Sequence, residues 1–262
     1  MNWIQRGCWL LAIAVVMVSL GCQESLRETI SSGNMTWTYS SGNGEEAIVG
    51  NGPLVMETRV ANGGFTAIRT NGAMTLRIVG AGSPALTVSA QKNILPYLTT
   101  TVEGHELRIR MTRTVSYDQP ITVTVTGAAI RALDLSGAVT AQADGLEGDQ
   151  VVLKADGASH GVVQGTARVL QVTTTGVSSI DARRLPANRI DGHAEGASRI
   201  TLAGSCQEAE LEAVGASSIQ AGGLETKRAR LSAMGASTIH LGHGGTVERT
   251  SLGASTIRLG RE

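Results

Sequence analysis

The sequence predicts an all-β fold, a parallel β-helix with coils of about 19–20 residues and irregular N-terminal coils. The main observation is a Gly-Ala-Ser-x-Ile block that recurs with spacings of 20, 19, 20, 19, 20 and 18 residues. Its copies begin at Gly137 (a degenerate copy), Gly157, Gly176, Gly196, Gly215, Gly235 and Gly253. Such a period is typical of a solenoid, in which each repeat buries its apolar edge by stacking on its neighbours.

The second observation is an alternation of small or aliphatic residues with more polar ones inside each repeat. One such set comprises Leu231, Ala233, Gly235, Ser237, Ile239 and Leu241. A period of two places successive side chains on opposite faces of a strand. Pro186 falls between two repeats, where it removes no ladder donor. The repeats are therefore expected to be strands.

The residues of the block have distinct expected roles. Glycine permits a positive φ or a sharp bend, and the serine can hydrogen-bond either to the turn or to the serine one coil away. We expect Ile200, Ile219, Ile239 and Ile257 to stack at about 4.8 Å per coil. Each buried isoleucine then contributes about 1.5–3 kcal/mol to stability.

Residues 1–21 have the features of a lipoprotein-type signal peptide. Arg6 precedes the apolar stretch Trp9–Leu20, and Gly21-Cys22 resembles the end of a bacterial lipobox. Cys22 is therefore the predicted lipidation site and membrane anchor; the alternative is an ordinary signal peptide or a short membrane anchor. Gln23, in place of Asp, implies export to the outer membrane of a Gram-negative bacterium.

The mature chain divides into three expected parts. Residues 22–47 are rich in Ser, Gly and Asn and are expected to form a flexible tether. Residues 48–126 alternate without a tight period and are expected to form irregular β coils that cover one end of the solenoid. Residues 127–262 contain the regular repeats, so that 48–262 is one continuous domain.

Charge and cysteine content exclude some function classes. The chain has 22 basic and 22 acidic residues, and removal of Arg6 with the signal leaves 21 and 22. Without a basic stripe, no nucleic-acid partner is expected. Cys8 leaves with the signal and Cys22 is modified, so Cys206 has no intramolecular disulfide partner. No cofactor is predicted, and the oligomeric state stays open.

Several segments resemble a known family. They are Phe65-Thr66-Ala67-Ile68, Lys92–Tyr97, Thr99–Gly104 and Leu107-Arg108-Ile109, together with the Gly-Ala-Ser-x-Ile copies. Over about residues 50–260 the chain resembles the bacterial family called putative auto-transporter adhesin, head GIN domain. The resemblance implies a right-handed parallel β-helix that is often lipid-anchored or secreted and has no assigned activity.

One polar patch is a candidate surface site. Asp191, His193 and Glu195 alternate along one strand, and alignment of the repeats places Glu210 beside Asp191 and Glu212 beside His193. Four carboxylates and an imidazole could hold a divalent cation or supply an acid–base pair. The alternative is a solvated face whose charge is offset by Arg230 in the next coil. The residue pattern designates no catalytic residue and no metal ligand.

Two further patterns follow from the repeat. Gly157–Gly161 matches the Gly-x-Ser-x-Gly elbow of serine hydrolases, but the repeat itself accounts for it. A column of small residues could be a docking surface or a tight corner, and we favour the corner. The column comprises Ala158, Val177, Ala197, Ala216, Ala236 and Ala254.

The sequence therefore predicts a non-enzymatic, membrane-tethered envelope protein, an adhesin or binding scaffold with a glycan or protein partner. The alternative is a carbohydrate-active β-helix protein that binds or cleaves a polysaccharide. No aromatic residue follows Tyr117, which disfavours this alternative because sugars commonly stack on aromatic rings. A third reading, end-to-end polymerisation, is disfavoured by the charged C-terminus.

Overall fold

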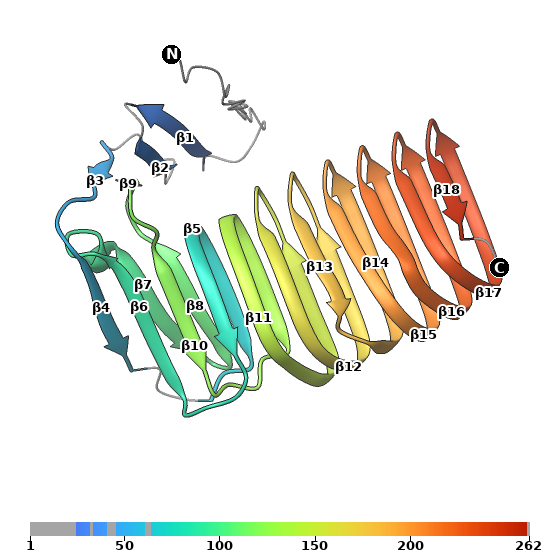
Figure 1. Cartoon of the computed structure of the whole chain (residues 1–262), viewed down its shortest axis with the longest axis horizontal. Helices are drawn as coiled ribbons and strands as arrows, with labels where there is room; N and C mark the ends of the chain where they lie inside the picture. Colours follow the sequence, from blue (N-terminus) through green and yellow to red (C-terminus); the bar gives the residue numbers. More distant parts are fainter. Residues whose placement is uncertain (1–24, 32–33, 41–45, 61–63, 261–262) are drawn as a thin grey trace, which may run out of the picture.

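The computed structural model describes residues 25–31, 34–40, 46–60 and 64–260. It confirms the predicted all-β class, since parallel coils stack along one axis as a β-solenoid (Figure 1). The strands of the regular part are β11 (Ala132–Ala155), β12 (His160–Thr174), β13 (Ser179–Arg184), β14 (Ala187–Gly196), β15 (Arg199–Gly215), β16 (Ser218–Gly235), β17 (Thr238–Gly253) and β18 (Thr256–Leu259).

Each regular coil has two segments. β13 pairs in parallel with the start of β15, and β14 pairs with its second half. Figure 1 shows the two segments as opposite sides of a flattened coil, joined by a pointed turn at one end and a rounded bend at the other. We call the side that carries Arg199 and its register partners face 1. The side that carries 208–214 and its register partners is face 2.

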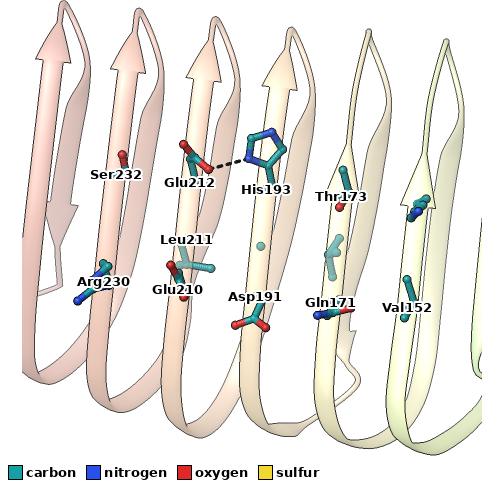
Figure 2. Close-up of a pocket in the computed structure, with 13 residues that line it drawn as sticks. Val152, Gln171, Thr173, Asp191, His193, Glu210, Leu211, Glu212, Arg230 and Ser232 are labelled. Atoms are coloured by element: carbon teal, nitrogen blue, oxygen red, sulfur yellow. Dashed lines mark hydrogen bonds and ion pairs between the residues drawn. The ribbon is translucent and has the colours of Figure 1, made fainter.

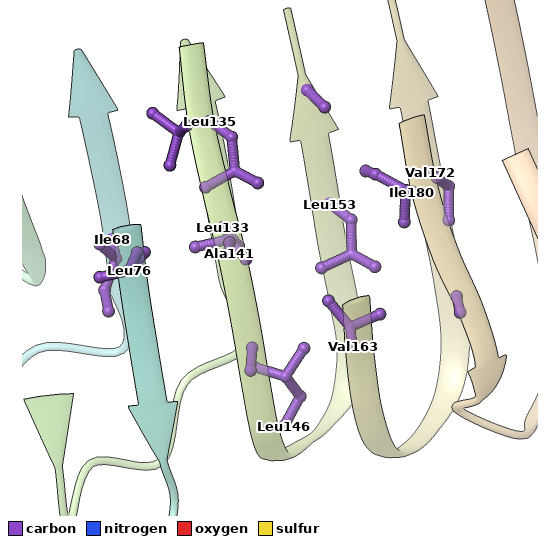
Figure 3. Close-up of a cluster of buried hydrophobic side chains, with 14 of the residues drawn as sticks. Ile68, Leu76, Leu133, Leu135, Ala141, Leu146, Leu153, Val163, Val172 and Ile180 are labelled. Atoms are coloured by element: carbon purple, nitrogen blue, oxygen red, sulfur yellow. The ribbon is translucent and has the colours of Figure 1, made fainter. Parts of the chain in front are cut away.

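The core lies between the two faces, and inward side chains of successive coils fill it (Figure 3). Ile180, Ile200, Ile219, Ile239 and Ile257 are consecutive register partners, so the predicted isoleucine ladder is confirmed. Its middle members are fully buried, whereas Ile257 in the last coil is only partly buried. The ladder extends one coil further toward the N-terminus than predicted.

The glycines of the blocks line the pointed turn. Gly157 has a φ of +75°, and Gly235 has a φ of +85°. A Cβ atom on Gly157 would lie 2.6 Å from the carbonyl oxygen of Gly137 in the preceding coil. Both the backbone conformation and the close approach of the coils therefore require glycine here.

The serine of each Gly-Ala-Ser block is buried and hydrogen-bonds to the preceding coil. The Ser217 hydroxyl donates to the Ala194 carbonyl oxygen at 2.9 Å, and Ser237 donates to that of Ala213 at 2.9 Å. The Ser178 hydroxyl lies within hydrogen-bond distance of two acceptors, the Ala155 carbonyl oxygen of the preceding coil at 2.9 Å and the Thr175 carbonyl oxygen of its own turn at 2.8 Å. The main acceptor is therefore a carbonyl of the preceding coil, which the sequence pattern had not indicated.

The small residue between glycine and serine is exposed at the turn. The Ala216 amide donates to the Gly196 carbonyl oxygen at 2.8 Å, and the same contact recurs at Ala236 with Gly215. This column therefore lies at a tight corner, as favoured from the sequence.

The first coils are irregular, as predicted. β5 (Ala67–Val79) pairs in parallel with β11, and the sheet continues through β10 (Thr122–Thr126) and β6 (Ala85–Gln91) to β4 (Leu54–Arg59). β8 (Glu106–Met111) pairs with β5 and with β7 (Leu98–Glu103), which follows the short 3-10 helix η1 (Leu95–Tyr97). β4 is the edge strand at this end of the solenoid (Figure 1).

The segment expected to be a flexible tether contains strands. β1 (Ser25–Ser31) and β2 (Asn34–Ser40) pair antiparallel, and β2 continues through β9 (Val115–Tyr117) to β3 (Ile48–Val49). The expectation rested on Ser, Gly and Asn content. However, Thr36-Trp37-Thr38-Tyr39 combines β-branched and aromatic residues, which favour strands.

The predicted signal peptide and Cys22 lie outside the described residues, as do Arg261 and Glu262. Within the described ranges, no helix has the length and apolar character needed to cross a bilayer.

Candidate functional site

The predicted polar patch lies on face 2. Asp191, His193 and Glu195 belong to β14, and their side chains point outward because Ile190 and Ala194 are buried. Glu210 and Glu212 belong to β15, where Glu210 is the register partner of Asp191 and Glu212 that of His193. The structure therefore brings together the two pairs that the alignment of repeats predicted.

The histidine contacts carboxylates of two coils. His193 Nδ1 lies 3.0 Å from Glu212 Oε2 (Figure 2), and its Nε2 lies 3.8 Å from Glu195 Oε2. Protonation of the imidazole would therefore place a positive charge between two carboxylates. The side chains are about 40–60% exposed, so we expect each pair to contribute at most about 1 kcal/mol.

Arg189, which the sequence analysis missed, is the central cation of the patch. Its guanidinium contacts Asp191 Oδ1 at 2.9 Å, Glu208 Oε2 at 3.1 Å and Glu210 Oε2 at 3.2 Å. The charge of Asp191 is the largest cause that raises the pKa of Arg189. Arg189 shares the parity of Asp191, and that signal could have placed it on the same face.

Arg230, which we expected to offset the charge of the patch, forms its ion pair with a residue outside the patch. Arg230 is the register partner of Glu210, but its guanidinium contacts Glu248 Oε2 at 3.2 Å in the following coil. Arg228 contacts Glu208, its register partner in the preceding coil. The carboxylate of Glu210 is offset instead by Arg189, one coil earlier.

Two rows of side chains border a shallow groove on face 2 (Figure 2). Its volume is about 450 Å³. One wall consists of Val152, Gln171, Asp191, Glu210 and Arg230, and the other of Lys154, Thr173, His193, Glu212 and Ser232. Each wall takes one residue from each of five consecutive coils. The groove therefore runs along the solenoid axis.

Gly192 lies on the floor of this groove. It occupies an inward position, where Leu211 is its register partner in the next coil. A Cβ atom at Gly192 would lie 3.0 Å from Leu211 Cδ2, so the leucine side chain fills the space that glycine leaves. The wall residues lie on either side of this position.

Among residues 25–31, 34–40, 46–60 and 64–260, no group of three or more His, Cys, Asp or Glu is arranged to hold a metal ion. Arg189 lies among the carboxylates that the sequence analysis considered as cation ligands. The contacts thus favour a network of ion pairs.

The Gly157–Gly161 elbow is structural. Ser159 is 1% exposed, and its hydroxyl donates to the Gly137 carbonyl oxygen at 3.3 Å. It lies in the same corner column as the other block serines, so its hydroxyl points into the solenoid.

A smaller polar cluster lies on face 1. His160 Nδ1 lies 2.6 Å from the Ser179 hydroxyl oxygen, and Arg183 pairs with Asp181 at 2.6 Å. The hydrogen bond from Arg183 is the main cause that lowers the pKa of Asp181. Cys206 is buried between the faces, and burial raises the pKa of its thiol. Neither location adjoins the groove.

Solved structures share this fold. A putative adhesin from Parabacteroides distasonis ATCC 8503 is 20% identical, with a TM-score of 0.70 over 82% of this chain and 100% of that chain. A putative lipid binding protein from the same organism is 16% identical, with a TM-score of 0.68 over 82% and 100%. A putative adhesin from Parabacteroides merdae ATCC 43184 is 16% identical, with a TM-score of 0.67 over 83% and 100%.

No curated protein matches the chain in sequence. The family model described as putative auto-transporter adhesin, head GIN domain, matches residues 64–260, which include the irregular coils from β5 onward and the regular repeats. The described fold and this match agree with the resemblance noted in the sequence. The chain belongs to the putative auto-transporter adhesin, head GIN domain family.

Proposed function

We propose that the chain is a non-enzymatic binding scaffold of the cell envelope, tethered to the outer membrane through an acylated Cys22. Its partner is an extended glycan or protein segment that lies in the groove on face 2. The family and the structures described as adhesins support an envelope location and a binding role.

The groove is the observation that carries this proposal. Its walls take residues from five coils, so four spacings of about 4.8 Å give it a length of about 19 Å. The walls offer amide, hydroxyl, carboxylate and cationic groups, and Arg189 offsets two of the carboxylates. An extended ligand with repeated polar groups would match such a surface better than a compact one.

A screen of envelope glycans and envelope proteins against the purified chain tests the proposal. Thr173→Trp should fill the groove and weaken binding of any partner at least about tenfold, a loss of about 1.4 kcal/mol. Thr201→Trp is the matched control because Thr201 is a half-buried outward threonine on face 1. Equal binding by both variants would place the partner elsewhere.

The contact between His193 and Glu212 favours one alternative, a carbohydrate-active protein. An imidazole beside a carboxylate in a groove could act as a general base. Incubation with envelope polysaccharides and measurement of new reducing ends separates the two functions. Cleavage that disappears in His193→Ala would support the enzyme, whereas binding without cleavage supports the scaffold.

A further inference from the structure

We propose that the N-terminal end of the solenoid is a lipid-contact surface, formed by Val49, Leu54 and Met56 with Lys92 beside them. We call these four residues the end patch. The inference rests on the proposed function, because it takes the chain to be anchored at Cys22, and it assigns the orientation of the body on the membrane.

The end patch exposes large apolar side chains. Val49 is 66% exposed, Leu54 45% and Met56 72%. Leu54 and Met56 have the same parity on β4, the edge strand, and Val60, which directly follows that strand, is also exposed. Exposed apolar residues concentrated in one place mark interaction sites, whereas scattered ones need no explanation.

Hydrogen bonds hold the end patch together. The Asn93 side-chain amide donates to the Val49 carbonyl oxygen at 2.8 Å, and the Lys92 amide donates to that of Pro53 at 3.3 Å. Gln91 is the register partner of Leu54. Lys92 is exposed, and its backbone therefore lies beside Pro53 and Leu54. Apolar groups with a neighbouring cation suit the headgroup region of an anionic bilayer.

The length of the chain limits how far this end lies from the anchor. Leu26, Tyr39, Val115 and Ile48 form one register row across β1, β2, β9 and β3, which spans three strand spacings, about 14 Å. The four residues from Cys22 to Leu26 add at most about 14 Å. Lipid on Cys22 therefore lies within about 28 Å of Ile48, the residue before Val49. The C-terminal coil lies at the opposite end of the solenoid (Figure 1).

Quenching of tryptophan fluorescence by brominated lipid tests direct contact. The full chain is reconstituted into vesicles of phosphatidylethanolamine and phosphatidylglycerol, with or without brominated acyl chains. The tryptophan introduced by Met56→Trp should lose at least about half of its fluorescence in brominated vesicles relative to unbrominated ones, because the indole ring enters the boundary of the acyl chains. Leu252→Trp is the matched control, since Leu252 is 60% exposed in the last strand pair. Equal quenching of the two variants, or none in either, would overturn the inference.

A second measurement separates this inference from the anchor itself. In the Cys22→Ser chain, Val49→Asp with Met56→Asp should lower sedimentation with the same vesicles at least about fivefold, because charge replaces apolar contact. Leu252→Asp with Leu259→Asp should leave it unchanged. If the Cys22→Ser chain binds vesicles as firmly as the unsubstituted chain, anchoring through Cys22 is contradicted. Fluorescence quenching in Met56→Trp still tests whether the end patch contacts lipid. Equal sedimentation of the two double variants would contradict the proposal.

Discussion

At the scale of single residues, the serines and glycines of the pointed turn form the specific contacts between stacked coils. A buried hydroxyl must find a partner, and each serine finds a carbonyl oxygen of the coil before it. Glycine beside it allows the two backbones to approach. The pair recurs because every coil meets its neighbour with the same geometry.

We predict that Ser217→Ala lowers the free energy of unfolding by about 1–3 kcal/mol, since it leaves the Ala194 carbonyl oxygen without its hydroxyl donor. Chemical denaturation measures the change. Ser205→Ala, at an exposed position of the same coil, is the control and should change stability by less than about 0.5 kcal/mol. Equal effects of the two substitutions would mean that the corner hydroxyl does not stabilise the stack.

Some residue-scale features were beyond sequence reasoning. The alignment of repeats placed Glu210 beside Asp191 correctly, because register follows from the repeat. It could not show that Arg189 contacts three carboxylates. A long arginine side chain can reach several carboxylates, and only the three-dimensional structure shows which of them it contacts.

At the scale of elements, the strands are held in register by inward columns of aliphatic side chains. The isoleucine ladder is the clearest column, and Ile219 lies at its centre with Ile200 and Ile239 as neighbours. A slip of one residue would turn these side chains outward, so the column also fixes the register.

We predict that Ile219→Asp abolishes cooperative folding of the coils. It should cost more than the about 2–5 kcal/mol of an isoleucine-to-alanine change, because it buries an unpaired carboxylate. Thermal melting followed by circular dichroism measures this. Ile257→Asp, in the same ladder but only partly buried, is the control and should lower the Tm less. An unchanged melting curve for Ile219→Asp would contradict the core assignment.

At the scale of the whole molecule, an irregular N-terminal end and a regular body have different properties. The irregular end carries the edge strand β4 and the exposed residues of the end patch. The regular body presents the groove on face 2. If the N-terminal end lies on the membrane, the groove extends away from it, along the solenoid axis.

We predict that Cys22→Ser releases most of the chain from the membrane, because the mature protein then lacks acyl chains, each buried methylene of which is worth about 0.8 kcal/mol. Membrane fractionation followed by immunodetection measures the distribution. Cys206→Ser is the control, since this buried thiol should have no part in anchoring. Membrane association of Cys22→Ser equal to that of the unsubstituted chain would contradict lipidation.

The sequence by itself determined the solenoid, the ladder and the pairing of coils across face 2. A repeat of nearly fixed length brings equivalent residues into register, and alternation tells which of them point inward. Only the tertiary structure decided the partner of each charge, the pairing of β1 with β2, and the groove above Gly192. These depend on side-chain reach and on contacts between segments far apart in the chain, such as β2 with β9, which no local pattern encodes.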